Sequence, residues 1–113
     1  MGAAFEVYNT LGSGFLEEVY QQSFEVELSR RHIPFQSQFE LQLHYKEVTL
    51  KKTYIADLIA FRTLIIELKA VSILTNEHLA QVMNYLKASR RPIGYLINFG
   101  HPRHLEWRRI SLE

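Results

Sequence analysis

The spacing of apolar positions divides the chain into a helical part and a longer strand-rich part. A short helix is predicted over residues 3–10, and it ends at Leu11-Gly12 because glycine readily adopts the left-handed conformation at a helix C-terminus. Apolar side chains at helical spacing then predict a longer helix from about Gly14 to Arg31. From Phe35 to Tyr45 apolar and polar residues alternate, which predicts a strand with one buried and one solvated face.

The rest of the chain reads mainly as strands. A turn at Lys46-Glu47 leads into them, and two nearly continuous apolar runs indicate two central strands joined by a tight hairpin. Asn76 is expected to cap the single helix of this part. The apolar runs predict strands over residues 53–61, 63–71, 92–99 and 105–111, the first of them preceded by Val48-Thr49-Leu50, and a helix over 76–88. The order α-α-β-β-β-α-β-β predicts an α/β (α+β) fold, with a central mixed sheet flanked by helices, in one domain over residues 1–113.

Composition narrows the class of protein. Of the 113 residues 47% are hydrophobic and 22% charged, which is typical of one globular domain with a modest core. The absence of cysteine excludes disulfides and thiolate-metal sites. No apolar run approaches the ~18 residues that a membrane span needs, and residues 1–9 lack the pattern of a secretory signal. We therefore expect a cytoplasmic protein without a membrane partner.

The charge balance alone does not identify a nucleic-acid-binding protein. The net charge is +1, whereas such domains are usually clearly basic. Five arginines in the last quarter of the chain would allow a basic rim on a near-neutral body, although solvated surface is the simpler interpretation. They are Arg90, Arg91, Arg103, Arg108 and Arg109.

Charged residues interrupt the two central strands. Strict alternation assigns two sets of side chains to one face of the hairpin: Ile55, Asp57 and Ile59, and Ile65, Glu67 and Lys69. A three-residue turn over 61–63 sets Asp57 directly across from Glu67, where like charges are destabilising. Two carboxylates among isoleucines need a compensating cation or a shared proton. Lys69 is one candidate for that cation, and a bound metal ion is the other.

Two interpretations of this cluster remain. A solvated sheet face with a Glu67–Lys69 salt bridge is the simpler one, but the isoleucines on the same face speak against it. As a functional site, the carboxylates would suit Mg²⁺ or Mn²⁺, which stabilise phosphate charge and activate water. Lys69 could hold that water, assist its deprotonation or steady the phosphate charge.

Three motifs in order resemble a known family. Asp57, nine residues, and then Glu67-Leu68-Lys69 resemble the PD-(D/E)XK nuclease signature, although Ile55-Ala56 stands where the proline would be. Residues 14–20 fit the Gly-x-x-Glu-x-x-Tyr pattern of the GxxExxY family, a small-domain branch of that superfamily. Residues 78–86 resemble the helix of that family, with its Gln-x-x-x-Tyr element, and the closing residues 96–100 fit as well.

The resemblance implies a restriction-endonuclease-like core and a Mg²⁺- or Mn²⁺-dependent nuclease that hydrolyses phosphodiester bonds, of DNA in preference to RNA. It implies that the metal is held by Asp57, Glu67, Glu17 and the backbone carbonyl of Leu68. Lys69 would be the catalytic lysine, and Gln81 and Tyr85 would position the water or the scissile phosphate. The catalytic residues would then be Asp57, Glu67, Lys69, Gln81 and Glu17.

Alternatives to these roles stay open. With Gly14 as N-cap, Glu17 would occupy the N3 position, where an acid favours the helix dipole whatever the function. Tyr85 could serve packing alone. The whole domain could be a catalytically inactive relative that binds nucleic acid or protein, or a homodimer formed through a sheet edge or the strand of Trp107. A domain with so little positive charge would need a partner protein or a second copy to hold a duplex.

Overall fold

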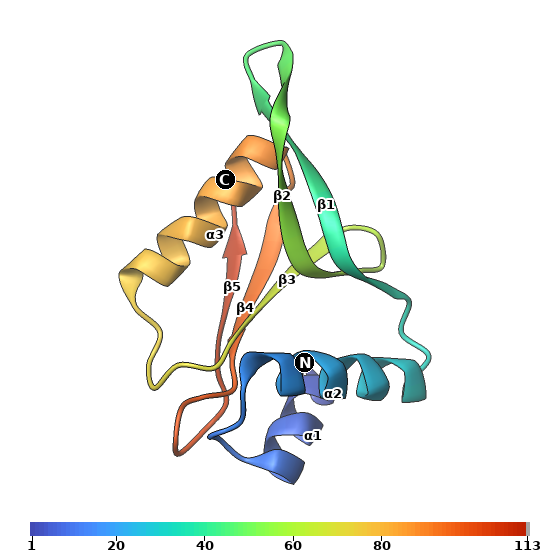
Figure 1. The fold of residues 1–113 in the computed structure, drawn as a ribbon, viewed down its shortest axis with the longest axis vertical. Coiled ribbons are helices and arrows are strands. Elements are labelled where there is room, and N and C mark those ends of the chain that lie inside the picture. Colours follow the sequence, from blue (N-terminus) through green and yellow to red (C-terminus); the bar gives the residue numbers. More distant parts are fainter. Residues whose placement is uncertain (113) are drawn as a thin grey trace.

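The predicted order of elements is the observed one (Figure 1). The computed structural model describes residues 1–112. The elements are α1 Gly2–Leu11, α2 Glu17–Arg30, β1 Phe35–Tyr45, β2 Val48–Ala60, β3 Leu64–Lys69, α3 Asn76–Ser89, β4 Ile93–Asn98 and β5 Glu106–Ser111. The strands form one sheet in the order β1-β2-β3-β4-β5, in which β3 and β4 run parallel and the other neighbours antiparallel. The predicted α+β class with a mixed sheet is therefore confirmed.

Helices cover both faces of the sheet. Neighbouring residues of one strand, such as Ile65 and Ile66, belong to different hydrophobic clusters and so point to opposite faces. One cluster joins α1 and α2 to the sheet around Tyr20 and Phe99, whose rings stack with centroids 4.8 Å apart. The other lies beneath α3, around Leu86. No helix within residues 1–112 is long and apolar enough to cross a membrane.

Both longer helices have a different N-cap from the one expected. α2 starts at Glu17 with Leu16 as its N-cap, because the chain is still turning at Gly14, where φ is 109°. The prediction that Gly14 caps the helix, with Glu17 at the N3 position, is therefore wrong. The cap of α3 is Thr75 and not Asn76. Thr75 donates its backbone N–H to Nδ1 of His78, at 3.0 Å, and its hydroxyl accepts the His78 N–H, at 3.4 Å.

The regular alternation predicted for β1 and β2 stops at one point. Gln38 has a φ of 50° and is left out of the pairing between the two strands, opposite Asp57. Beside it, Ala56 packs beneath α3 whereas Leu58 packs beneath α1 and α2, although residues two apart share a face in a regular strand. Asp57 therefore lies where β2 changes the face that it buries.

The expectation that Ile55, Asp57 and Ile59 share one apolar face is wrong for the same reason. Ile59 is buried beneath α3, but Ile55 on the other side of the irregularity is exposed by 44%. The apolar surroundings of the carboxylates therefore come from fewer isoleucines than strict alternation implied.

Candidate metal centre

The β2–β3 hairpin brings two carboxylates to the same place. Residues 61–63 form the turn, and Phe61 and Arg62 both have positive φ. Ala60 lies opposite Leu64, so the predicted register is confirmed. The pairing continues only to Leu58 and Ile66, and the next residue on each strand is Asp57 and Glu67.

Beyond that last pair the two carboxylates bind the backbone of each other's strand. Oδ2 of Asp57 accepts the N–H of Leu68 at 2.7 Å, and Oε2 of Glu67 accepts the N–H of Asp57 at 3.3 Å. From α2, Nε2 of Gln21 donates to the carbonyl oxygen of Asp57 at 3.0 Å. Side chains thus satisfy backbone groups at the opening between the strands, and they fix both carboxylates in place.

Glu67 is the electrostatically strained member of the pair. Its side chain is only 5% exposed. Burial, and then the nearby charge of Asp57, raise the pKa of Glu67 well above its usual range, while the Tyr54 hydroxyl opposes this rise. Within residues 1–112, Oε1 of Glu67 is a buried side-chain oxygen without a hydrogen-bond partner. Such an atom calls for a proton or a cation.

Tyr54, which the sequence did not single out, lies beside Glu67. Burial and then the adjacent Glu67 carboxylate raise the pKa of Tyr54 above its usual range. Its ring stacks on that of Tyr85 with centroids 3.4 Å apart, and the Tyr85 hydroxyl accepts a weak hydrogen bond from Nε2 of Gln81 at 3.5 Å. Gln81 and Tyr85 therefore reach Glu67 through Tyr54. In the sequence Tyr54 looks like any core aromatic, so only the stack reveals it.

Glu17 and Lys69 lie at the border of the carboxylate pair. Glu17, the first residue of α2, is exposed; partial burial and the charge of Asp57 raise its pKa, while the charge of Lys69 lowers it. Lys69 ends β3 and is half-buried. Over residues 1–112 the structure records one ion pair, between Arg31 and Glu27, so Lys69 makes no salt bridge to Glu67. The simple structural interpretation of the cluster thus lacks its central contact.

The Gly-x-x-Glu-x-x-Tyr spacing has a local physical basis. Gly14 adopts a φ of 109°, which only glycine reaches without strain. Tyr20 is fully buried, and its hydroxyl donates to the carbonyl oxygen of Gly12 and accepts the N–H of Phe15. Tyr20 therefore holds the turn that precedes α2, and this turn determines where Glu17 begins the helix.

The residues present fit a hard divalent cation. Asp57 and Glu67 offer carboxylate oxygens, and one of these has no hydrogen-bond partner among residues 1–112. The N–H and C=O of a strand residue project to the same side, so the carbonyl of Leu68 points, like its N–H, into the opening between β2 and β3. No three His, Asp or Glu side chains in the described part of the chain form a ready-made cluster. A hard divalent cation that keeps several waters needs only one or two protein carboxylates.

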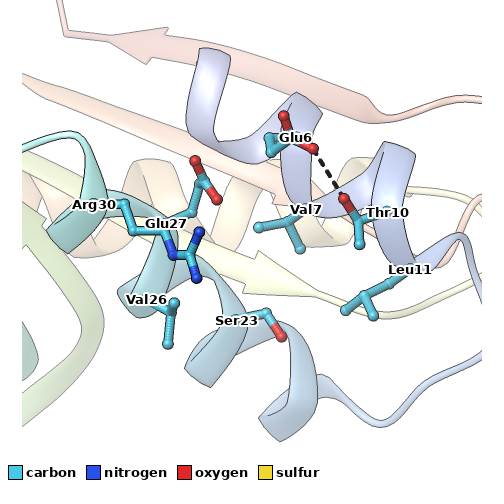
Figure 2. A pocket seen from close by; sticks show the side chains of 8 residues that line it. All are labelled: Glu6, Val7, Thr10, Leu11, Ser23, Val26, Glu27 and Arg30. Atoms are coloured by element: carbon cyan, nitrogen blue, oxygen red, sulfur yellow. Dashed lines mark hydrogen bonds between the residues drawn. The ribbon is translucent and has the colours of Figure 1, made fainter.

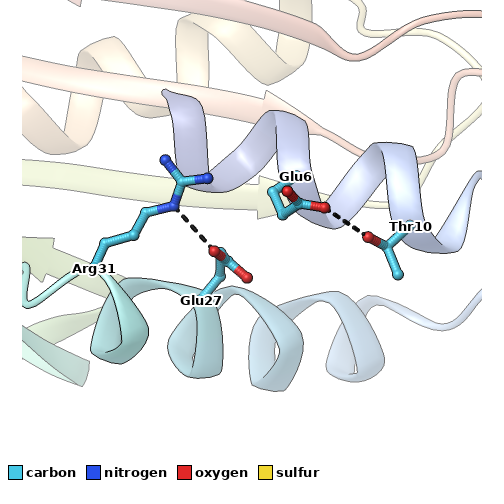
Figure 3. Close-up of polar contacts among 4 residues, drawn as sticks. All are labelled: Glu6, Thr10, Glu27 and Arg31. Atoms are coloured by element: carbon cyan, nitrogen blue, oxygen red, sulfur yellow. Dashed lines mark hydrogen bonds and ion pairs between the residues drawn. The ribbon is translucent and has the colours of Figure 1, made fainter.

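A hollow elsewhere on the molecule lacks such chemistry. It measures about 540 Å³ and lies between α1 and α2, where Val7 and Val26 line it (Figure 2). Its polar contacts stay within one helix or its cap: Thr10 donates to Glu6, and Arg31 pairs with Glu27 at 3.0 Å (Figure 3). These are ordinary i,i+4 contacts of a helix surface. The hollow therefore gives no competing catalytic site.

The chain resembles a known family and a solved structure. The family model described as PD-(D/E)XK nuclease superfamily matches residues 1–110. The crystal structure of SSO0001 superposes with a TM-score of 0.64 over 85% of this chain at 18% identity, and the likeness concerns the fold. This chain spans 50% of the length of that protein. The search of curated proteins gave no match.

Proposed function

The chain belongs to the PD-(D/E)XK nuclease superfamily, and from this membership we propose that it is a metal-dependent nuclease that hydrolyses phosphodiester bonds of DNA, in preference to RNA. The observation that carries the proposal is the Asp57–Glu67 pair, in which Oε1 of Glu67 is buried and has no hydrogen-bond partner in the described part of the chain. A charged carboxylate held in this way raises the free energy of the folded state unless something compensates it. Within the superfamily we assign the chain to the GxxExxY branch, on Gly14, Glu17 and Tyr20.

We assign the metal site to Asp57, Glu67 and the Leu68 carbonyl, with Glu17 as a further ligand or as a group that acts through water. Mg²⁺ or Mn²⁺ bound there would supply positive charge against which the charge of a reacting phosphate is stabilised. Gln21 supports this arrangement because it holds the Asp57 carbonyl, and so keeps the Asp57 backbone in position.

Lys69 is the proposed catalytic lysine. Its ammonium group makes no ion pair in residues 1–112, so it can donate hydrogen bonds to an attacking water or to a phosphate oxygen. Gln81 is exposed and can contact the substrate directly, whereas Tyr85 is stacked on Tyr54 and positions that ring beside Glu67. We therefore infer that Gln81 positions the scissile phosphate or the water, and that Tyr85 supports it.

The test is a cleavage assay on the whole chain. Labelled single- and double-stranded DNA and RNA are incubated with Mn²⁺, Mg²⁺ or EDTA, and product is expected with the metals but not with EDTA. Lys69→Met should abolish most of this activity, and Lys87→Met, which removes a lysine exposed on α3, is the matched control. No metal-dependent product on any of the four substrates would leave the inactive binding module as the better description.

A further inference from the structure

The β1–β2 hairpin extends far beyond the rest of the sheet. β2 has 13 residues but pairs with β3 only over Leu58–Ala60, so for most of its length β1 is its one neighbour. Figure 1 shows the tip of this hairpin projecting past the sheet and α3 along the longest axis of a molecule that measures 45 × 31 × 24 Å. We call residues 43–53 the ribbon, and every residue from 45 to 52 is exposed.

The ribbon carries an excess of positive charge. Lys46, Lys51 and Lys52 stand against one acid, Glu47, and none of the four makes an ion pair in the part of the chain that the structure describes. The pairing shifts between Gln42–Thr53 and His44–Thr49, which leaves residues 50–52 opposite a single residue of β1. Lys51 and Lys52 lie in this bulge and are exposed, and bulges commonly re-aim side chains.

Apolar side chains on the ribbon are exposed as well. Tyr45 is exposed by 63% and Val48 by 54%. A two-stranded ribbon without a third strand is only marginally stable in water, and here Arg90 at the end of α3 donates to the Lys46 carbonyl and ties the ribbon to the body. Lys46 lies in the turn between β1 and β2, so the ribbon is held at its tip while these apolar side chains stay exposed, which indicates a surface for contact with a partner.

We propose that the ribbon enters a groove of double-stranded DNA; this rests on the proposed function. A two-stranded ribbon fits the major groove, lysines bind the phosphates that border it, and Tyr45 and Val48 contact base edges and sugars. Val48 pairs with Tyr45 and Asp57 lies opposite Gln38, so seven steps of β1 at ~3.3 Å put Val48 roughly 23 Å from Asp57. The ribbon therefore binds phosphates about two thirds of a ~34 Å helical turn from the bond that is cut.

The five arginines of the last quarter do not form one rim in the structure. Arg90 and Arg91 follow α3, Arg103 lies in the loop between β4 and β5, and Arg108 and Arg109 point to opposite sides of β5. Since counterion release on DNA binding grows with the number of phosphates contacted together, a compact group of lysines is the stronger candidate.

The experiment measures binding without catalysis. Anisotropy of a labelled duplex of roughly two helical turns is followed in EDTA at several salt concentrations. Lys51→Gln/Lys52→Gln is expected to weaken binding about tenfold and to lower the slope of log K against log salt by about 2. The control, Arg30→Gln/Arg103→Gln, removes the same charge from exposed positions outside the ribbon and should change both quantities less. Tyr45→Ser should weaken binding without changing the slope.

Several results would overturn the proposal. If the ribbon and control variants lose the same affinity, the effect comes from net charge and not from the ribbon. If the lysine variant loses the same affinity for single-stranded DNA as for the duplex, the ribbon does not bind in a groove. Unchanged affinity with an altered sedimentation coefficient would make the ribbon a contact between two copies of the chain. Because the assay needs no metal, duplex binding through the ribbon without any cleavage in Mg²⁺ refutes the nuclease and leaves the ribbon proposal standing. Cleavage with unchanged duplex binding in the lysine variant refutes the ribbon alone.

Discussion

The two ends of β2 show how differently one strand can be used. At the inner end, Leu58 and Ile59 are buried on opposite faces of the sheet, and the backbone of Asp57 is bound by side chains from β3 and α2. At the outer end, Val48 and the residues after it are exposed and have only β1 beside them. The side chains at the inner end are thus held by the elements packed on both faces of the sheet and not by the strand itself. The outer end, which no helix covers, is free to contact a partner.

Neutralising Asp57 should give the largest change. Asp57→Asn keeps an oxygen that can accept the Leu68 N–H, but it removes a negative charge from the proposed metal site. We expect cleavage to fall by roughly 10³-fold, or about 4 kcal/mol. In EDTA the melting temperature should rise slightly, because a like charge beside Glu67 is gone. Glu77→Gln on α3 is the control, and a lower melting temperature with full activity would mean that Asp57 is structural.

Truncation of one leucine at each end of β2 tests the difference in cover directly. Leu58 is fully buried, so Leu58→Ala should lower the free energy of unfolding by about 3 kcal/mol. Leu50 is exposed by 39%, and Leu50→Ala should lower it by less than about 0.5 kcal/mol. Urea denaturation of the two variants measures both values. Similar losses at the two positions would show that the ribbon is packed against something.

The buried end should also respond to pH. The folded state holds a proton on Glu67 more tightly than the unfolded state, whose glutamate pKa is near 4.5. Below that pH Glu67 is protonated in both states. As the pH rises through the raised folded pKa, ionisation of Glu67 favours the unfolded state. The free energy of unfolding in EDTA should therefore fall by on the order of 1–3 kcal/mol. Urea denaturation across this interval measures the loss.

Two controls isolate Glu67 as the source. Glu67→Gln should flatten the dependence, because glutamine resembles the protonated acid. Saturating Mg²⁺ should reduce the loss in the wild type, since a cation takes the place of the proton. A stability that stays level between pH 5 and 8 in EDTA, an interval where carboxylates with ordinary pKa values no longer titrate, would contradict the charge assignment at Glu67.

The smallest expected effect distinguishes two roles for the first turn of α2. Glu17 and Glu18 both lie there and both favour the helix dipole. Only Glu17 lies in the field of Asp57 and Lys69. Glu17→Gln should therefore reduce cleavage about tenfold, as loss of an outer group of a metal site does, while Glu18→Gln leaves it unchanged. Equal activities of the two variants would assign Glu17 to the helix dipole alone.

Local patterns predicted the features that depend on local physics. The hairpin register followed from the sequence because a short turn fixes which residues face each other, so Ala60 had to lie opposite Leu64 and Asp57 next to Glu67. The helix ends were less well predicted, since the cap of α3 is decided by a side-chain exchange between Thr75 and His78. In the sequence Thr75 and Asn76 are both suitable N-cap residues, and the contact with His78 distinguishes them.

Other features of the site depend on contacts between distant segments. The Tyr54–Tyr85 stack and the bond from Gln21 to the Asp57 carbonyl each join residues more than thirty positions apart. The change of face at Asp57 lies opposite Gln38, whose φ is positive, in the neighbouring strand. A periodic pattern in one strand cannot report a distortion that begins in another, which is why the isoleucine environment was overestimated.

The parallel pairing of β3 with β4 bears on the order in which the chain can fold. Short turns join β1 to β2 and β2 to β3, so their contacts close small loops, whereas β4 reaches β3 only after the 23 residues from 70 to 92. Closing a longer loop costs more chain entropy and slows the step that requires it. We expect the β2–β3 hairpin to form early and the β4–β5 pair to dock later, with α3. Asp57 and Glu67 would then meet before the core that holds them is complete, so divalent cations should accelerate refolding as well as stabilise the product.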